Sequence, residues 1–113
     1  MAAFNPDLWP ASWILSLIAA GNLHAFYISR EWRALAAAVR KEQRNRCWDC
    51  EHKIPARVRR GVTVHHVHPV RERPDLALSR YDEAGRINLV CLCDSCHWER
   101  HHKRKQIKIP ERW

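Results

Sequence analysis

The stretch Cys93-Asp94-Ser95-Cys96-His97 decides the fold of this chain, because it places two thiols on one tight turn and a histidine directly after them. A second turn of the same kind, Cys47-Trp48-Asp49-Cys50, stands upstream. Two such turns brought together supply four soft ligands in the tetrahedral arrangement that zinc prefers. The fifth cysteine, Cys91, lies in an apolar run and is interpreted as a buried strand thiol. An odd thiol argues against an oxidised secreted scaffold, so we expect a structural zinc in a reducing compartment, held by Cys47, Cys50, Cys93 and Cys96.

Length and charge narrow the class of protein further. A chain of 113 residues suffices for one domain with a thin core, which a structural zinc would reinforce. The formal net charge of +8 indicates a polyanionic partner, since lysine and arginine release condensed counterions from nucleic acid. The apolar run at residues 12–20 is shorter than the roughly 20 residues of a membrane span, and no basic cluster precedes it. We therefore expect a short docking helix between Pro10 and Gly21, or alternatively a partner-binding surface, with no membrane partner.

The pattern along the rest of the chain predicts helices and short strands. Ser29 is a favourable N-cap for a helix whose apolar residues share one face, while its arginines lie off that face and either are solvated or contact phosphate. Residues 54–58 and 62–67 predict two strands joined at Arg60-Gly61, and residues 87–92 predict another. Residues 71–86 indicate a long loop with one helical turn. A helix over residues 94–105 completes a ββα unit.

Two pairs of histidines carry the chemistry of this unit. His65 and His66 are adjacent in a predicted strand, so their side chains point to opposite faces and one can hold a metal while the other approaches a water or substrate. His97 and His101 are four residues apart on the predicted C-terminal helix and share one face, which is a common metal-binding spacing. The paired cysteines would then align the strand with the helix.

These residues occur in an order that resembles the HNH nuclease motif in its zinc-containing ββα-metal form: Cys47-x-x-Cys50, His65-His66-Val67-His68-Pro69, Asn88-Leu89 and Cys93-x-x-Cys96-His97. The resemblance spans residues 26–103 and is nearest in kind to small phage-encoded HNH endonucleases, which carry a similar Arg-Glu-Trp-Arg helix and Arg-Pro-Asp-Leu-Ala-Leu loop. It implies an α+β fold, namely a ββα-metal (HNH) unit stabilised by a structural zinc on four cysteines, with flanking N-terminal helices. Residues 1–28 would form a docking helix and extension, residues 29–105 the nuclease domain and residues 106–113 a basic tail.

The resemblance also implies roles for single residues. His66 would be the general base that activates water, and Asn88 would orient it by holding the strand or the backbone partner of its ring. His65 stands where many relatives have an aspartate that binds the catalytic divalent metal, and His97 is the opposing ligand. His101 matches a further histidine of the colicin-type subgroup. A histidine-rich shell is softer than one with aspartate and suits Ni²⁺, Zn²⁺, Co²⁺ or Mn²⁺ better than the Mg²⁺ of many relatives.

The expected partner is DNA, which a metal-dependent endonuclease would nick or cut, with no small-molecule substrate. Arg71 and Arg73 follow the proline of the motif and are candidates for clamping a phosphate. Lys103 and Arg104 belong to a basic run that either tracks DNA or is a solvated helix end. The resemblance to phage proteins implies terminase subunits as further partners and the cytoplasm of a bacterial host as the location.

Two rival classes of protein explain part of the same pattern. A zinc-stabilised nucleic-acid-binding module without catalysis explains the four cysteines and the charge, but not the spacings of His66, Asn88 and His97. A rubredoxin-like iron electron carrier also uses two Cys-x-x-Cys turns, yet it predicts an acidic or neutral surface and no histidine cluster. The sequence therefore favours the endonuclease, with the binding module as the alternative.

Overall fold

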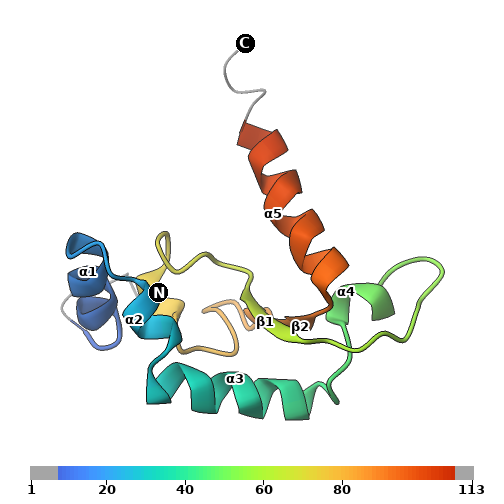
Figure 1. The fold of residues 1–113 in the computed structure, drawn as a ribbon, viewed down its shortest axis with the longest axis horizontal. Helices are drawn as coiled ribbons and strands as arrows, with labels where there is room; N and C mark the ends of the chain where they lie inside the picture. The colour runs from blue at the N-terminus through green and yellow to red at the C-terminus, as the bar shows by residue number, and fades with distance from the viewer. Residues whose placement is uncertain (1–7, 109–113) are drawn as a thin grey trace.

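The computed structural model describes the backbone of residues 8–108 and the side chains of residues 8–102. Five α-helices, one 3-10 turn and one two-stranded sheet follow one another along this part of the chain (Figure 1). The elements are α1 (Ala11–Ala19), α2 (His24–Tyr27), α3 (Arg30–Glu42), α4 (Trp48–Glu51), β1 (Thr63–His66), η1 (Pro74–Leu76), β2 (Leu89–Leu92) and α5 (Asp94–Lys108). None of the helices described combines the length and the apolarity needed to span a membrane.

The sheet is an antiparallel pair in which His66 lies opposite Leu89 and Thr63 opposite Leu92. Strand β2 is buried along its whole length. The side chain of Gln43, at the end of α3, covers its outer edge: the Gln43 amide donates to the Leu89 carbonyl at 2.9 Å and accepts from the Cys91 amide at 2.8 Å. An unpaired strand edge leaves backbone amides and carbonyls without partners. The Gln43 side chain supplies the two hydrogen bonds to β2 that a neighbouring strand would otherwise make at these positions.

The two faces of this sheet are covered by different clusters. One face, with Val64 and Leu89, belongs to a core that includes Ile14 of α1, Phe26 of α2 and Trp32 of α3. The other face, with Val90 and Leu92, packs against the four cysteines that were predicted to bind zinc. Figure 1 shows the same division, with α3 running along one side of the strands and α5 projecting from the other. Adjacent residues of β1 therefore face different environments.

The helices begin and end close to the residues that the sequence predicts. The Ser29 hydroxyl accepts a hydrogen bond from the Trp32 amide at 3.2 Å, which confirms the predicted N-cap of α3. Gly21 follows α1 with a φ of +66°, the left-handed conformation that glycine adopts most readily after a helix. The predicted helical turn within residues 71–86 is η1. The C-terminal helix starts at Asp94, as predicted, and extends three residues further, to Lys108.

The predicted strand at residues 54–58 is wrong. This segment is an exposed loop in which Ile54 is fully accessible, with a relative exposure of 101%. Its alternating apolar residues have no buried surface to face, and Pro55 lacks the amide hydrogen that a strand would use. Backbone bonds hold the loop instead, from the Arg57 amide to the Cys50 carbonyl and from the Cys47 amide to the Arg59 carbonyl. The strand that pairs with β1 is therefore β2.

Candidate active site

Four cysteine thiols meet at the base of α5. Cys47 caps α4, Cys50 lies within it, Cys93 follows β2, and Cys96 is in the first turn of α5. Their sulfur atoms lie within 4.8 Å of one another, and the Cys50 sulfur is 3.9 Å from that of Cys93 and 3.6 Å from that of Cys96. Zinc–sulfur bonds of about 2.3 Å in a tetrahedron place the sulfurs about 3.8 Å apart. The cluster is compatible with the predicted zinc site, and its sulfur separations are too long for disulfides, which need about 2.05 Å.

Of the four thiols, Cys93 has surroundings that favour negative charge on sulfur, whereas burial raises the pKa values of Cys50 and Cys96. The Lys53 ammonium lies 3.4 Å from the Cys96 sulfur. Burial alone would raise the pKa of the Cys93 thiol, but hydrogen bonds from the Cys96 amide and from neighbouring thiols hold that pKa at about 7. Because metals bind thiolates rather than thiols, a sulfur that ionises near neutral pH is suited to a cation.

Three imidazoles form a second cluster on the same helix. His65 of β1 meets His97 and His101 of α5, and one ring nitrogen from each lies within 4.8 Å of the others. The Nε2 atoms of His97 and His101 are 3.0 Å apart. Nitrogen atoms bound about 2.1 Å from one ion are about 3.0–3.4 Å apart in octahedral or tetrahedral geometry, so the three rings fit a single divalent ion. His97 and His101 thus share a helical face, as their spacing predicts.

The surroundings of His65 and His97 favour the neutral form of each ring. Burial, followed by the positive charge of Arg100 and the neighbouring histidines, lowers the pKa of His65 to about 3. Burial and His101 also lower the pKa of His97. A neutral imidazole has a lone pair for a metal, whereas a protonated one has none.

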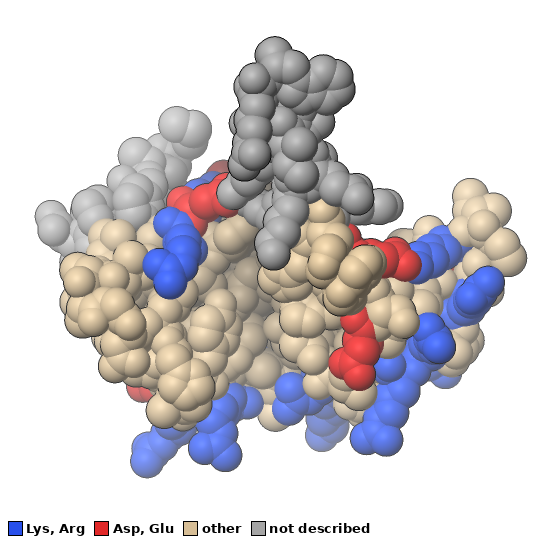
Figure 2. All heavy atoms as spheres, turned by 45° about the horizontal axis from the view of Figure 1, so that its top comes forward, with Lys and Arg blue, Asp and Glu red and all other residues tan. Residues whose placement is uncertain are grey.

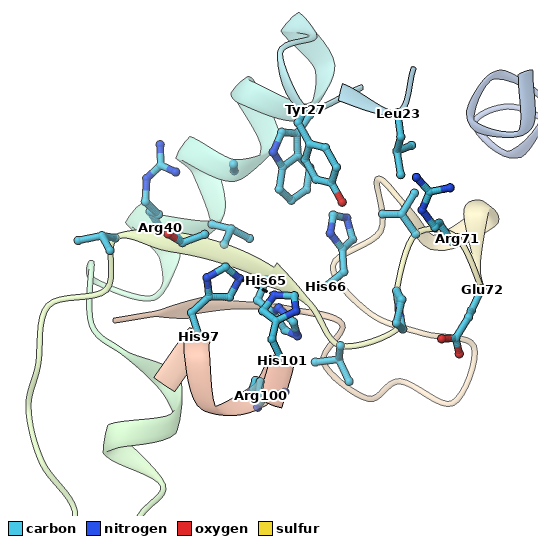
Figure 3. Close-up of a pocket in the computed structure, with 18 residues that line it drawn as sticks. Leu23, Tyr27, Arg40, His65, His66, Arg71, Glu72, His97, Arg100 and His101 are labelled. Carbon is cyan, nitrogen blue, oxygen red and sulfur yellow. Dashed lines mark hydrogen bonds between the residues drawn. The ribbon is translucent and has the colours of Figure 1, made fainter. Parts of the chain in front are cut away.

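His66 points to the opposite face of β1, into an aromatic pocket. Its ring stacks on Trp32 with centroids 4.5 Å apart, and Phe26 and Tyr27 lie at 6.0 and 6.3 Å. The side chain is 6% exposed, and its Nε2 atom lies 2.9 Å from the Ala77 carbonyl oxygen. Burial lowers the pKa of His66, and the Ala77 hydrogen bond partly opposes that shift. Figure 3 shows His66 and the three-histidine cluster bordering the same pocket, with Tyr27 beside His66.

Asn88 is fully buried directly before β2, and its side chain makes no hydrogen bond to the His66 ring. Its amide nitrogen donates to the Leu76 and Ser79 carbonyls at 3.0 and 2.9 Å, and its oxygen accepts from the His68 amide at 3.0 Å. These bonds tie the loop that carries Ala77 to the segment that follows His66. Asn88 therefore fixes the position of the carbonyl to which the His66 ring is bound.

The predicted phosphate-binding residues have different surroundings. Arg71 is exposed at one end of the pocket (Figure 3). The Arg73 guanidinium is held by Asp75 and Glu83 at 2.9 and 3.0 Å. The side chains of Lys103 and Arg104 lie outside the described residues.

Tyr27, Arg40 and Arg100 also border the pocket. Arg40 is one of the helix arginines that were expected to be solvated or to contact phosphate, whereas Tyr27 and Arg100 were not predicted as pocket residues. Arg100 makes a bidentate ion pair with Asp49 of the first cysteine turn, at 2.6 and 2.7 Å. It lies one turn after the second cysteine pair and between His97 and His101, and this position is the signal that could have identified it. Tyr27 lies in the short helix α2, which no sequence pattern predicts.

One solved structure resembles this chain over most of its length. It is the crystal structure of the HNH endonuclease of the deep-sea thermophilic bacteriophage GVE2 with manganese ion, which matches with a TM-score of 0.64 and 26% sequence identity. The match covers 86% of this chain and 95% of that one. No protein-family model and no curated protein match the sequence. The structural match confirms the predicted resemblance to HNH endonucleases and the predicted fold class, and the four-cysteine cluster is compatible with the zinc that this fold class includes.

Proposed function

We propose that this protein is a metal-dependent HNH endonuclease that hydrolyses DNA phosphodiester bonds. One observation carries the proposal: adjacent residues of β1 border one pocket with two imidazoles in different settings. His65 belongs to a three-imidazole cluster, and His66 is a buried, oriented imidazole on the other face. Phosphodiester hydrolysis needs both a proton acceptor for water and a cation for the developing charge.

His66 has the geometry of a general base. A carbonyl oxygen can only accept a hydrogen bond, so the contact with Ala77 requires the proton on Nε2. The other nitrogen, Nδ1, then has a free lone pair. The lowered pKa leaves the ring neutral at pH 7, in the state that can take a proton from water. Asn88 would act as a positioning residue, because it holds the loop of Ala77 rather than the ring itself.

His65, His97 and His101 would hold the divalent metal. A bound ion supplies charge stabilisation for the scissile phosphate and the departing oxygen. Imidazole ligands favour Mn²⁺, Co²⁺, Ni²⁺ or Zn²⁺ over Mg²⁺. The similar phage protein was crystallised with manganese, which supports a divalent ion for this chain as well.

Arg71 is the arginine best suited to a substrate phosphate at the His66 end of the pocket, because no described carboxylate pairs with it. The ion pairs of Arg73 make it a poorer donor to phosphate. Beyond the chemistry, we extend the proposal to DNA as the substrate, on the basis of the +8 charge and the name of the similar protein. Phage origin, terminase partners and a location in the bacterial cytoplasm stay predictions of the resemblance.

The test is cleavage of supercoiled plasmid by the zinc-loaded protein with Mg²⁺, Mn²⁺ or Ni²⁺. His66→Ala should reduce the rate by about 10²–10⁴-fold, the usual contribution of a positioned general base. The matched control is His68→Ala, which removes an imidazole two residues away that does not line the pocket and that pairs with Asp82. Zinc content and circular dichroism should be unchanged in both variants.

Two results would contradict the proposal. One is that the wild-type protein binds plasmid but cuts it with none of the metals, which would favour the non-catalytic binding module. The other is that His66→Ala and His68→Ala cut as fast as the wild type.

A further inference from the structure

The charges of α3 are segregated to opposite sides of the helix. With about 100° of rotation per residue, Arg30, Arg33 and Arg40 fall within about 80° of one another. Glu31 and Glu42 lie on the other side, where Glu42 pairs with Arg80 at 2.7 Å. The side with the three arginines, called here the arginine face, borders the buried edge of the helix at Ala36.

The three arginines of the arginine face make no ion pair with any residue whose side chain is described. Elsewhere, Arg46 pairs with Glu51, Arg73 with Asp75 and Glu83, Arg80 with Glu42, and Arg100 with Asp49. Exposed arginines outside α3, such as Arg57, Arg71 and Arg86, make no ion pair with a described residue either. Each guanidinium keeps five donors available in a rigid fork that matches the oxygens of phosphate. The arginine face therefore stands out because three such guanidiniums lie on one side of a single helix.

The arginine face continues into the catalytic pocket. A groove along α3 is lined by all three arginines, with Ala34 and Ala37 between them. It shares Tyr27, Trp32, Ala36 and Arg40 with the pocket that contains His66. Figure 2 shows lysine and arginine atoms along the lower edge of the molecule, the edge at which α3 runs in Figure 1. A ligand seated at His66 can thus extend along α3 without leaving positively charged surface.

We propose that the arginine face of α3 binds the phosphate backbone of duplex DNA that flanks the scissile bond, on the His66 side of the pocket. Arg30 and Arg40 are about 15 Å apart along the helix axis, which corresponds to four or so base-pair steps of about 3.4 Å. The identity of the ligand as the substrate's own flank rests on the proposed endonuclease function. Contacts of this kind position a duplex without reading its sequence.

The chemistry of the groove favours nucleic acid over an acidic protein. Protein interfaces place aromatic or large aliphatic anchors at their centre. Alongside the three arginines, the groove is lined by Ala34, Ala36 and Ala37, which let a backbone approach the helix closely. Of its two aromatic residues, Trp32 is buried and stacks on His66, and Tyr27 is partly exposed where the groove meets the His66 pocket. A row of unpaired cations with small residues beside them suits a chain of phosphates.

The test is the salt dependence of binding to a fluorescent duplex of about 30 base pairs between about 50 and 200 mM KCl, in a His66→Ala background that keeps the DNA intact. The variant is Arg30→Gln/Arg33→Gln, which spares Arg40 because that residue lines the His66 pocket. Glutamine and arginine have similar helix propensities, so α3 should keep its structure. Loss of two phosphate contacts should make the slope of log K against log salt shallower by about 1.8.

The matched control is Arg57→Gln/Arg86→Gln. It also removes two positive charges, from exposed arginines that line neither the groove along α3 nor the His66 pocket. The control slope should equal that of the parent. An unchanged slope in the α3 variant, or an equal change in the control, would overturn the proposal. The two proposals fail separately: a wild-type protein that never cuts, but whose binding depends on Arg30 and Arg33, refutes the endonuclease and supports the arginine face. Cleavage by the wild type, together with an unchanged salt slope in the α3 variant, would support the endonuclease and refute the arginine face.

Discussion

The four-cysteine cluster and the three-histidine cluster share helix α5 but differ in burial and in the number of ligands. Every cysteine of the first is at most 6% exposed, and its four sulfurs supply as many ligands as a tetrahedral ion takes. In the second, His65 and His97 are half-buried, His101 is exposed, and three nitrogens leave further coordination positions open to the pocket. Metal sites that support a fold are closed, whereas those that bind substrate keep an open position. Exposure and ligand number therefore predict that losing the first cluster unfolds the protein and losing the second only inactivates it.

The largest expected effect is that of Cys50→Ser on the closed cluster. Zinc binding to such sites contributes about 10–16 kcal/mol in peptides near neutral pH, which equals or exceeds the stability of most small domains. We expect the variant to lose both zinc and cooperative thermal unfolding. Elemental analysis and circular dichroism measure the two properties.

The control for this prediction is Cys91→Ser, the same substitution at a fully buried thiol outside the cluster. It should keep about one zinc per chain. A Cys50→Ser protein with full zinc and an unchanged unfolding temperature would show that the four cysteines do not support the fold.

Substitution in the open cluster should separate activity from stability. His97→Ala removes one of three metal ligands, and even partners one shell further out typically contribute about 10–100-fold to affinity or activity. We expect at least about a 100-fold loss of Mn²⁺-dependent cleavage, with structural zinc retained. The unfolding temperature should stay within about 4 °C of wild type, a shift that corresponds to less than about 1 kcal/mol. Plasmid cleavage and manganese titration provide the measurements.

His102→Ala on the same helix is the matched control, because that ring stacks on Trp98 and lies outside the three-histidine cluster. If His97→Ala unfolded the protein as Cys50→Ser is expected to, the proposed division between a supporting and a reactive cluster would be wrong.

Asn88→Ala should have an intermediate effect, which lowers both the stability of the protein and its cleavage activity. It leaves the Ser79 carbonyl and the His68 amide without their partner, whereas the Leu76 carbonyl keeps its bond from the Ser79 amide at 3.1 Å. The cost should be about 2–4 kcal/mol, since one unsatisfied buried group costs about 1–3 kcal/mol. The Ala77 carbonyl should also become mobile, so His66 should no longer be held with its proton on Nε2. Nitrogen NMR of the His66 ring reports that tautomer directly. A destabilised Asn88→Ala protein with an unchanged His66 tautomer would give Asn88 a structural role only.

The sequence was most informative where the geometry is local. The Ser29 cap, the turn of each cysteine pair, the alternation of His65 and His66 and the four-residue spacing of His97 and His101 follow from backbone periodicity, and the structure contains each of them. The strand at residues 54–58 failed because its alternation had no partner strand to bury it, and strand formation depends on that partner.

The aromatic pocket was not predictable for a related reason. The periodicity of α3 places Trp32 on its apolar face, but nothing local shows that this face meets the ring of His66 or that Tyr27 lies beside it. Those contacts join residues that lie far apart in the sequence. The Asp49–Arg100 pair likewise connects two turns that only the completed fold brings together.

The smallest expected effect concerns that pair, which links the two clusters. Asp49 lies in the first cysteine turn, and its carboxylate pairs with Arg100. Arg100 is the charge that lowers the pKa of His65 most, and only burial lowers it more. Arg100 repels a cation that enters the histidine cluster. The negative charge of Asp49 reduces this repulsion. Asp49→Asn should therefore weaken Mn²⁺ binding by about two- to five-fold, and Arg100→Gln should strengthen it by a similar factor, because partly exposed charges interact by only about 0.5–1 kcal/mol.

The opposite signs of these two effects make the pair a test of how separate the clusters are. The double variant Asp49→Asn/Arg100→Gln should bind manganese with nearly wild-type affinity, because the charge and its neutralising partner disappear together. Glu99→Gln is the control. Glu99 lies on α5, as Arg100 does, but it pairs with Lys53 and does not line the pocket, so its loss should leave manganese affinity unchanged. If the Asp49 and Arg100 variants lost affinity in the same direction, the pair would act by fixing α5 against the first cysteine turn rather than by charge. The closed cluster would then set the geometry of the open one, so that its role would extend from folding to metal affinity.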